Sequence, residues 1–200
     1  MIISHKHKFI FVKTRKTAGS SIEKYLFSYL GSDDICTGSD RDQTPALNAH
    51  LLPDRNGHVG SEFIAEHFPT EYKNYYKFSV ERNSWDKVVS YYYWYGKTKP
   101  AKVKNGFDHF VLTSGKKLSD WKMYTNKSIF CVDDVFLYED LHNQFCKQTV
   151  IPYNNELLNT FCKSGIRKNK NYRLMYTNQE TIDRVSSVFE KEIEKFGYKF

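Results

Sequence analysis

Long apolar runs are missing from this sequence of 200 residues. No stretch approaches the roughly 18 apolar residues that a membrane-spanning helix needs. The basic start of the chain, residues 1–8, is followed by no signal-peptide core, which would take about 7–15 apolar residues. These absences predict a cytoplasmic chain that has no membrane as a partner.

Cysteine is also scarce, and repeats and low-complexity tracts are absent. The four cysteines are widely spaced and form no CxxC or Cys/His pattern of a metal site. We therefore expect reduced, partly buried thiols and no bound metal. The length fits one domain with a sizeable core, so we expect a single domain over residues 1–200. The cysteines are Cys36, Cys131, Cys146 and Cys162.

Aromatic residues, in contrast, are abundant. They make up 16% of the chain and include 15 Tyr and 15 Phe, which indicates a folded, well-buried protein rather than a disordered one. The formal net charge is +7. Such a charge suits an anionic ligand, a nucleic acid or an acidic glycan, and does not choose among them.

The most informative stretch is a basic loop, Lys13–Ser21. It follows a predicted buried strand, Phe9–Val12, and precedes residues 22–30, whose apolar positions have helical spacing. Gly19 allows close approach of the backbone, and two serines follow it. The N–H groups and the dipole of a helix start attract anions, and Lys16 adds a mobile positive charge. The pattern predicts a phosphate- or sulfate-binding loop; the alternative is an ordinary turn with a serine cap.

A second candidate anion site follows the next predicted strand, Tyr76–Glu81. Arg82 comes directly after this strand, and its planar guanidinium suits a phosphate group. Asn83 or Ser84 can cap the helix that follows. Ser90, eight residues after Arg82, adds a hydroxyl group. The alternative for Arg82 is an ordinary salt bridge.

Residues 11–22 and 78–91 resemble the two cofactor motifs of PAPS-dependent sulfotransferases, where PAPS is 3′-phosphoadenosine 5′-phosphosulfate. The first is similar to the 5′-phosphosulfate loop, P-K-T-A-G-[ST]-[ST]. The second is similar to the 3′-phosphate motif, F-x-x-V-R-N-P-[WY]-[DE]-R-[LV]-[LV]-S-x-Y. Weaker matches at 135–141 and 196–200 extend the resemblance over almost the whole chain. Arg15 and Ser84 replace family prolines.

The alternation of strands and helices predicts an α/β fold with parallel strands and a ligand at their carboxyl ends. The resemblance implies a P-loop nucleotide-binding-like fold with a central parallel sheet flanked by helices. It implies a soluble carbohydrate-type enzyme of prokaryotic or viral style, which moves a sulfuryl group from PAPS to an acceptor hydroxyl, on a glycan or a small hydroxyl compound, and releases PAP. The implied cofactor-binding residues are Arg15, Lys16, Thr17, Ala18, Gly19, Ser20, Ser21, Arg82, Ser90, Arg167 and Lys168.

Two catalytic residues are expected, Lys16 and His58. The segment Gly57–Val59 precedes a predicted helix at 61–68, and heparan-type relatives take their base from such a segment. An acceptor hydroxyl must lose a proton, and histidine titrates near the working pH. A surface or capping role for His58 stays open. Other possible bases are His50, Glu62 and Glu66.

Two other functions stay open. A nucleotide kinase on the same fold needs a Walker A lysine after a glycine, which is missing, and an aspartate for Mg²⁺ at a strand end. The candidates for that aspartate are Asp133, Asp134 and Asp140. A basic nucleic-acid- or anion-binding module without catalysis agrees with the charge and with the aromatic run Tyr91–Tyr95. We nevertheless expect an acceptor substrate rather than a nucleic acid as the partner.

The remaining elements are predicted from periodicity and turn residues. Residues 31–60 should be mostly loop. The final helix should begin with a capping box, Thr177-x-x-Glu180, and end at Gly197. Further elements are predicted as a strand at 135–138 and helices at 107–112, 140–148 and 154–163.

Overall fold

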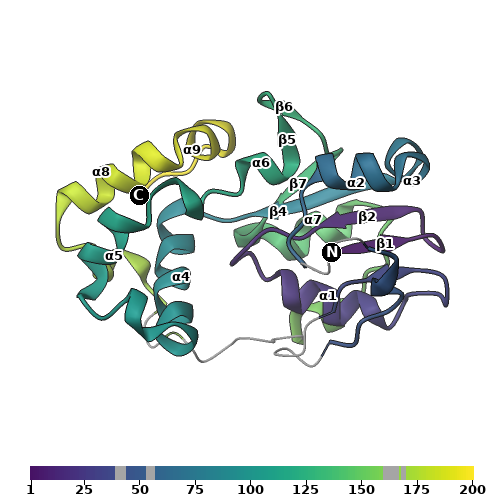
Figure 1. The fold of residues 1–200 in the computed structure, drawn as a ribbon, viewed down its shortest axis with the longest axis horizontal. Coiled ribbons are helices and arrows are strands. Elements are labelled where there is room, and N and C mark those ends of the chain that lie inside the picture. Colours follow the sequence, from purple (N-terminus) through teal and green to yellow (C-terminus); the bar gives the residue numbers. More distant parts are fainter. Residues whose placement is uncertain (39–43, 53–56, 160–166, 168–169) are drawn as a thin grey trace. The chain divides into compact units, whose positions relative to one another are not determined.

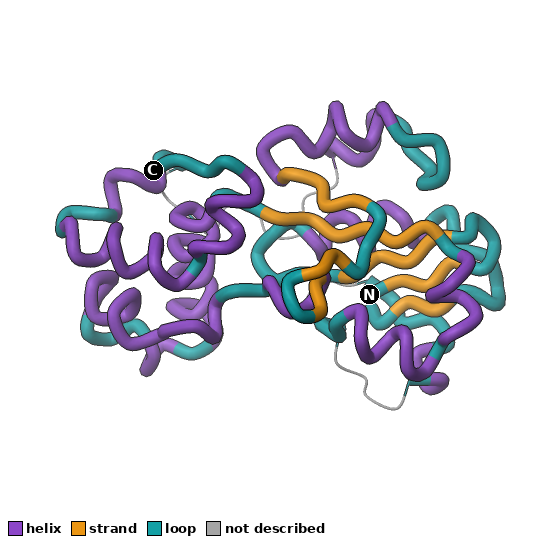
Figure 2. The backbone as a smooth tube through the Cα atoms, turned by 90° about the horizontal axis from the view of Figure 1, so that it is seen from above, coloured by secondary structure: helices purple, strands orange, loops and turns teal. Residues whose placement is uncertain are grey.

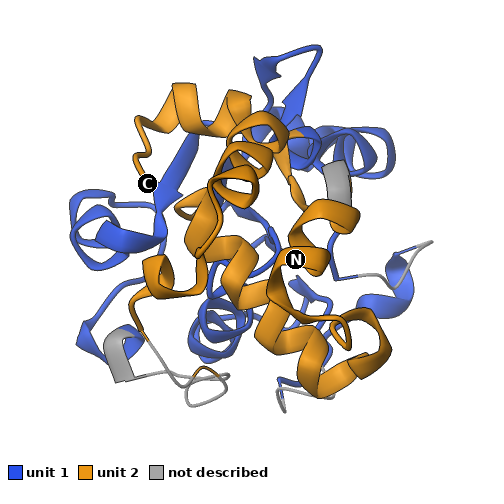
Figure 3. Cartoon of the chain, turned by 90° about the vertical axis from the view of Figure 1, so that its left-hand side faces the viewer, with its two compact units in different colours: residues 1–81, 122–163 blue, residues 82–121, 164–200 orange. Residues whose placement is uncertain are grey.

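The computed structural model of this chain describes residues 1–38, 44–52, 57–159, 167 and 170–200. The chain forms two compact units (Figure 3). Unit 1 contains residues 1–81 and 122–163, and unit 2 contains residues 82–121 and 164–200. A single domain over residues 1–200 stays a prediction, and each unit is described below by itself.

Unit 1 is built on a five-stranded mixed sheet with the strand order β3-β1-β2-β4-β7 (Figure 2). Strands β2, β4 and β7 are parallel, whereas β1 pairs antiparallel with both β2 and β3. The predicted α/β class is confirmed, but the sheet is only partly parallel. The strands are β1 (Ile2–Ser4), β2 (Phe9–Val12), β3 (Ile35–Cys36), β4 (Tyr76–Glu81) and β7 (Asp134–Leu137).

Helices cover both faces of this sheet. In Figure 1, α1 and the α2–α3 pair lie on opposite sides of β1 and β2. Ile22 and Leu26 of α1 and Phe145 of α7 belong to one buried cluster with Phe11 and Phe78 of the sheet. The helices of unit 1 are α1 (Gly19–Phe27), α2 (Ser61–His67), α3 (Pro69–Asn74), α6 (Trp121–Tyr124, whose first residue belongs to unit 2) and α7 (Leu141–Lys147). A small hairpin joins β5 (Thr125–Asn126) and β6 (Ile129–Phe130), and 3₁₀ turns occupy Ala49–Leu51, Tyr138–Asp140 and Asn155–Asn159.

The described part of unit 2 is helical. Trp85 and Val88 of α4, Phe110 of α5 and Phe189 form its core together with Tyr176. The helices are α4 (Ser84–Thr98), α5 (Gly106–Ser114), α8 (Gln179–Val188) and α9 (Glu190–Phe196), with 3₁₀ turns at Pro100–Lys102, Gly115–Leu118 and Tyr172–Met175. No helix in the described ranges has both the length and the apolar character that crossing a membrane requires.

Several predicted elements need correction. The final helix is two helices, because the backbone leaves helical geometry at Phe189. Its cap is Asn178, whose side chain accepts a hydrogen bond from the Glu180 N–H group, so a capping box at Thr177 is wrong. Gly197 ends the second helix in the left-handed region, as predicted. The helix predicted at 154–163 is a 3₁₀ turn over Asn155–Asn159, and residues 160–163 lie outside the described residues.

Candidate active site

The three parallel strands of unit 1 end at one edge of the sheet. Val12 of β2 is paired with Ser79 of β4, and Glu81 of β4 is paired with Leu137 of β7. The basic loop leaves β2 at this edge, and Arg82 follows β4 directly in the sequence. Because ligands of open α/β sheets bind beyond the carboxyl ends of the strands, both predicted anion-binding segments begin where such a fold favours a ligand.

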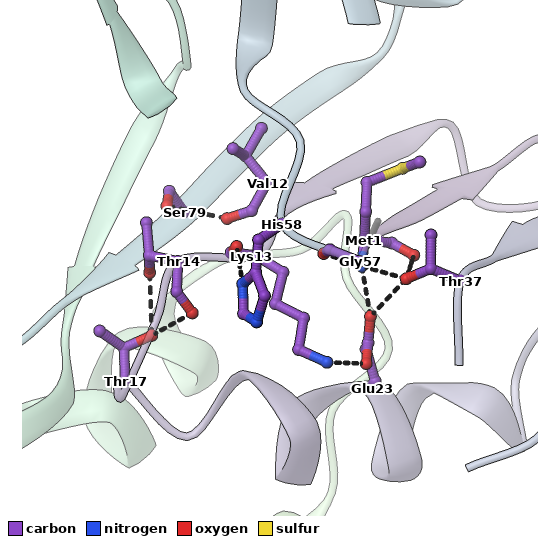
Figure 4. A network of polar contacts seen from close by, with 10 residues as sticks. All are labelled: Met1, Val12, Lys13, Thr14, Thr17, Glu23, Thr37, Gly57, His58 and Ser79. Atoms are coloured by element: carbon purple, nitrogen blue, oxygen red, sulfur yellow. Dashed lines mark hydrogen bonds and ion pairs between the residues drawn. The ribbon is translucent and has the colours of Figure 1, made fainter. Parts of the chain in front are cut away.

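Buried polar contacts fix the loop after β2 (Figure 4). The Thr14 hydroxyl donates to the backbone carbonyl of Val80 on β4, and it lies 2.8 Å from the hydroxyl of Thr17. The Ser79 hydroxyl donates to the carbonyl of Val12 over 2.9 Å. Both threonines are buried. The Thr17 side chain therefore holds the loop from inside, so its predicted cofactor contact can come from its backbone only.

Lys13 is held inside the unit rather than presented to a ligand. Its ammonium group pairs with the buried carboxylate of Glu23 on α1 (Figure 4). Burial alone would raise the pKa of Glu23, but the ammonium groups of Met1 and Lys13 outweigh it and lower that pKa. A Cβ atom on Gly19 would lie 2.7 Å from the Cγ atom of Lys13. Gly19 is thus required for the passage of the Lys13 side chain, in addition to any approach of a ligand.

The backbone of the loop has an unusual shape. Lys16 and Ala18 both have φ 64°, in the left-handed region that residues other than glycine rarely adopt. Helix α1 begins at Gly19, and its first internal bond joins the Ile22 N–H group to the Ala18 carbonyl over 3.0 Å. A left-handed residue before a helical one turns successive N–H groups into an anion-binding concavity, to which the helix dipole adds. The half-buried side chains of Arg15 and Lys16 flank this turn.

His58 contacts the same loop from a segment 45 residues away. Its Nδ1 atom lies 2.9 Å from the carbonyl oxygen of Lys13 (Figure 4). Since a carbonyl oxygen only accepts, Nδ1 carries the proton and Nε2 carries the lone pair. The imidazole is exposed. The structure therefore brings the predicted base to the predicted sulfate-binding loop, in the tautomer that a base needs.

The three rival bases are also exposed. His50 lies on the 3₁₀ turn at Ala49–Leu51, and Glu62 and Glu66 lie on α2. Within the described ranges, none of these side chains forms a hydrogen bond with the loop, whereas His58 does. His58 thus differs from the other three candidate bases in its contact with the loop, and its role as a base stays a prediction.

Unit 2 contains the second candidate site, a cluster of two arginines around one carboxylate. Arg82 donates from Nε and Nη2 to Oδ2 of Asp86, over 2.8 and 2.6 Å. Arg167 pairs with the other oxygen, Oδ1, of Asp86. Ser90 is half-buried on α4, one helical turn beyond Asp86. The structure therefore joins Arg82 and Arg167 in a salt bridge with net charge +1, while Lys168 lies outside the described residues.

The aspartates that a kinase would need lie elsewhere. Asp134 begins β7 and Asp133 precedes it, so both lie at the end of this strand opposite to the basic loop. Asp133 pairs with Lys77, and Asp134 accepts a hydrogen bond from the Tyr76 hydroxyl. Asp140 follows β7 and accepts bonds from two side-chain amides of α7, which lower its pKa. Each of these carboxylates already has a structural role.

The aromatic run Tyr91–Tyr95 packs mainly against other residues of unit 2. Tyr91 is buried, and the Tyr92 ring packs edge-on against Phe107. The ammonium groups of Lys99 and Lys102 lie 5.9 and 5.2 Å from the centre of the Tyr95 ring. Single-stranded nucleic acids stack their bases on open aromatic faces, whereas Tyr91 is buried and the four aromatic side chains at 92–95 are half-buried.

Two important residues escaped the sequence analysis, Glu23 and Asp86. Asp86 stands four residues after Arg82, which is the spacing of an ion pair at a helix start, and this was an available signal. Glu23 gave no signal, because nothing in the sequence shows that Lys13 turns inward. Cys36 is buried, Cys131 half-buried and Cys146 exposed, all as free thiols, and Cys162 lies outside the described residues.

Comparisons with models of known protein families, with curated proteins and with solved structures gave no match.

Proposed function

We propose that this chain is a PAPS-dependent sulfotransferase with a P-loop-type sheet. It moves a sulfuryl group from PAPS to an acceptor hydroxyl, most simply one of a carbohydrate, and releases PAP. The observation that carries the proposal is the hydrogen bond from His58 Nδ1 to the Lys13 carbonyl. It brings a base with its lone pair on Nε2 to a basic, anion-binding loop at the carboxyl edge of parallel strands.

In this proposal the loop binds the 5′ end of the cofactor. The N–H groups of Gly19, Ser20 and Ser21 at the start of α1 hold the 5′-phosphate. Lys16 stabilises the negative charge that grows on the bridging oxygen as the sulfuryl group leaves. By analogy with oxyanion donors, one preorganised charge of this kind contributes about 3–4 kcal/mol to the lowering of the barrier.

The transfer itself is an in-line displacement. The acceptor oxygen forms a new bond to sulfur, and the bond between sulfur and the bridging oxygen breaks, leaving its electron pair on PAP. The acceptor proton moves to Nε2 of His58, which is the nitrogen left with a lone pair by the bond to Lys13. No metal is required in this scheme, because Lys16 supplies the positive charge.

The arginine cluster of unit 2 binds the 3′-phosphate in this proposal. Arg82 and Arg167 provide forked donors, and Ser90 provides a hydroxyl group on the same side of α4. ADP and ATP have no 3′-phosphate, so this contact makes the protein select PAPS and PAP. A kinase is less well supported, since Asp133 and Asp134 lie at the opposite end of their strand.

Thermal melting with PAP and with ADP, at matched concentrations, tests the proposal. A ligand at about 100 times its dissociation constant stabilises the folded state by about 2.7 kcal/mol, which shifts the melting temperature of a chain of this size by several degrees. We expect a shift with PAP and little or none with ADP. Equal shifts would contradict the 3′-phosphate site and favour a general anion-binding module, whose affinity would fall steeply with salt.

A further inference from the structure

The carboxylate of Asp86 joins the two arginines of unit 2. Arg82 uses Oδ2 and Arg167 uses Oδ1, so each oxygen serves one guanidinium group. All three side chains are largely withdrawn from solvent, with exposed fractions of 11% for Arg82, 16% for Arg167 and 13% for Asp86. Such shielding strengthens charge interactions relative to those at an open surface.

Asp86 is itself fixed by the start of α4. Its N–H group donates to the side-chain oxygen of Asn83, the cap of this helix, over 3.2 Å. Asn83 in turn donates to the carbonyl of Lys199 over 3.1 Å. A carboxylate in the first turn is also favoured by the helix dipole. Asp86, which holds the cluster together, thus has a short side chain at a capped helix start, whereas the two arginines that it holds have long, flexible side chains.

Arg167 depends on this anchor. Apart from the pair with Asp86, its guanidinium donates to the carbonyl of Lys170, which belongs to its own segment, over 2.8 Å. Its Nε atom is buried and has no acceptor among the described residues, and the same holds for the hydroxyl oxygen of Ser84 at the first residue of α4. Buried polar atoms without partners call for a water or a bound ion. Asp86 is therefore the contact that ties Arg167 to α4, and the Nε atom of Arg167 stays available for a further partner.

We propose that Asp86 is a positioning residue that orients Arg82 and Arg167 as one binding pair for a phosphate group. The inference rests on the proposed function, because it takes the 3′-phosphate of the cofactor as the ligand. Binding of a phosphate by two forked donors requires both forks in place, and fixing them beforehand removes the cost of ordering two long side chains. The pair keeps a net charge of +1 after Asp86 is counted, so it still attracts an anion.

The first test is Asp86→Asn, which keeps the size of the side chain but removes its charge. The measurement is the dissociation constant for PAP and for ADP by calorimetry. We expect PAP to bind about 10-fold or more weakly, with ADP unchanged. Asp183→Asn is the control, because Asp183 is exposed on α8 and removes the same charge without touching the arginines. Unchanged or tighter PAP binding in Asp86→Asn would overturn the inference and identify Asp86 as a competing anion.

A double-mutant cycle separates positioning from general damage. If Asp86 acts through Arg167, the loss of PAP affinity in Asp86→Asn combined with Arg167→Ala should be clearly smaller than the product of the two single losses. Fully multiplicative losses would mean that Asp86 acts independently of Arg167, and the inference would fail. If Asp86→Asn melts below the assay temperature, Asp86→Glu replaces it. Its carboxylate is displaced by one methylene, which should also weaken the binding of PAP but not that of ADP.

A spectroscopic measurement keeps this inference distinct from the proposed function. The Nε–H signals of Arg82 and Arg167 are followed by NMR while inorganic phosphate is added. Signals that shift in the wild type and stay unmoved in Asp86→Asn support the positioning role, even if PAP and ADP bind equally and the sulfotransferase proposal fails. Equal shifts in both proteins would exclude the positioning role, even if PAP is preferred to ADP.

Discussion

The two candidate anion sites are built in different ways. In unit 1 the loop owes its shape to its backbone, with Lys16 and Ala18 in the left-handed region and Thr14 bonded to the neighbouring strand. In unit 2 the site consists of side chains, the guanidinium groups of Arg82 and Arg167 held on one carboxylate. The first site offers mainly backbone N–H groups to an anion, and the second offers charged side chains.

Under the proposed function, we expect this difference to separate catalysis from affinity. A backbone site survives the loss of one side chain, so the exchange of Lys16 or His58 should impair the reaction more than the binding of the cofactor. A site made of side chains loses its contacts when one of them is removed. The substitution of Arg82 should therefore impair the binding of the cofactor more than the reaction. Each substitution below therefore tests whether rate belongs to unit 1 and affinity to unit 2.

The largest effect is expected for Lys16→Ala. The substitution removes the charge that we propose to stabilise the leaving oxygen, while the buried contacts that fold the loop stay. We therefore expect sulfuryl transfer to fall by about 10³-fold with an almost unchanged melting temperature. The measurement is the turnover of labelled PAPS with an excess of acceptor. Lys24→Ala is the matched control, since Lys24 is exposed on α1 and should have no effect. Turnover close to that of the wild type would remove Lys16 from the mechanism.

His58→Gln is expected to lower turnover by about 10²-fold, as is usual for the loss of a general base. The wild-type rate should rise with pH over the range in which histidine titrates, and this rise should vanish in the variant. His67→Gln is a close control, because His67 also bonds a backbone carbonyl through Nδ1, over 2.9 Å to Phe63. A pH profile that persists without His58 would transfer the role of base to another group.

Arg82→Ala should act on affinity. The loss of a charge-assisted pair of hydrogen bonds to the 3′-phosphate should weaken the binding of PAP by about 30-fold. Turnover at saturating PAPS should change less. Arg173→Ala is the control, because it removes the same charge from unit 2 at a side chain that lies over the Tyr172 ring. If turnover falls and affinity does not, the assignment of affinity to unit 2 is wrong.

The sequence predicted those parts of the fold that rest on local patterns. Strand β4 has the predicted bounds, Tyr76–Glu81, and its aromatic and β-branched residues alternate with polar ones, a local pattern that is typical of a strand. Asn83 caps α4 as expected. The role of His58 as a base was predicted from a resemblance and stays a prediction, whereas its bond to the Lys13 carbonyl was not predicted from the sequence.

The rest depended on contacts that a sequence does not display. Strand β1 was missed because the turn after it, residues 5–8, contains histidines and lysines rather than glycine or proline. The left-handed residues Lys16 and Ala18 carry none of the usual signals for that conformation. The choice of Asn178 over Thr177 as a cap is a shift of one residue, which propensity alone does not resolve.

Gly19→Ala tests whether the loop in unit 1 is as tightly built as its backbone indicates. The new Cβ atom would overlap Lys13 at 2.7 Å, so we expect a loss of about 2 kcal/mol in the free energy of unfolding. Gly96→Ala gives the opposite expectation. Gly96 lies inside α4, where a Cβ atom would meet only Val103 at 3.8 Å, so alanine should stabilise by about 0.5–1 kcal/mol. Both values come from denaturant unfolding; a neutral Gly19→Ala would mean that Lys13 can move aside.

The last expected effect is on the pH dependence of stability. Asp34 is buried in unit 1 and accepts four hydrogen bonds, from the Ser4 hydroxyl and from the N–H groups of His5, Lys6 and Gly31. Burial alone would raise the pKa of its carboxyl group, but these bonds outweigh it and hold the pKa below the ordinary value of 3.8.

The charged form of Asp34 therefore stabilises the fold above pH 3.8, and this contribution disappears as the pH falls through the lower pKa of the folded state. Asp34→Asn should lose about 1 kcal/mol of unfolding free energy at neutral pH, and the deficit should shrink in acid. Asp33→Asn, at the exposed neighbouring position, should show neither change. The pKa of Glu23 is also lowered, in its case by the ammonium groups of Met1 and Lys13, so acid should also weaken the ion pair between Glu23 and Lys13 next to the loop of unit 1. Denaturant unfolding at neutral and at acidic pH measures this, and a deficit for Asp34→Asn that is independent of pH would show that the carboxylate charge plays no part.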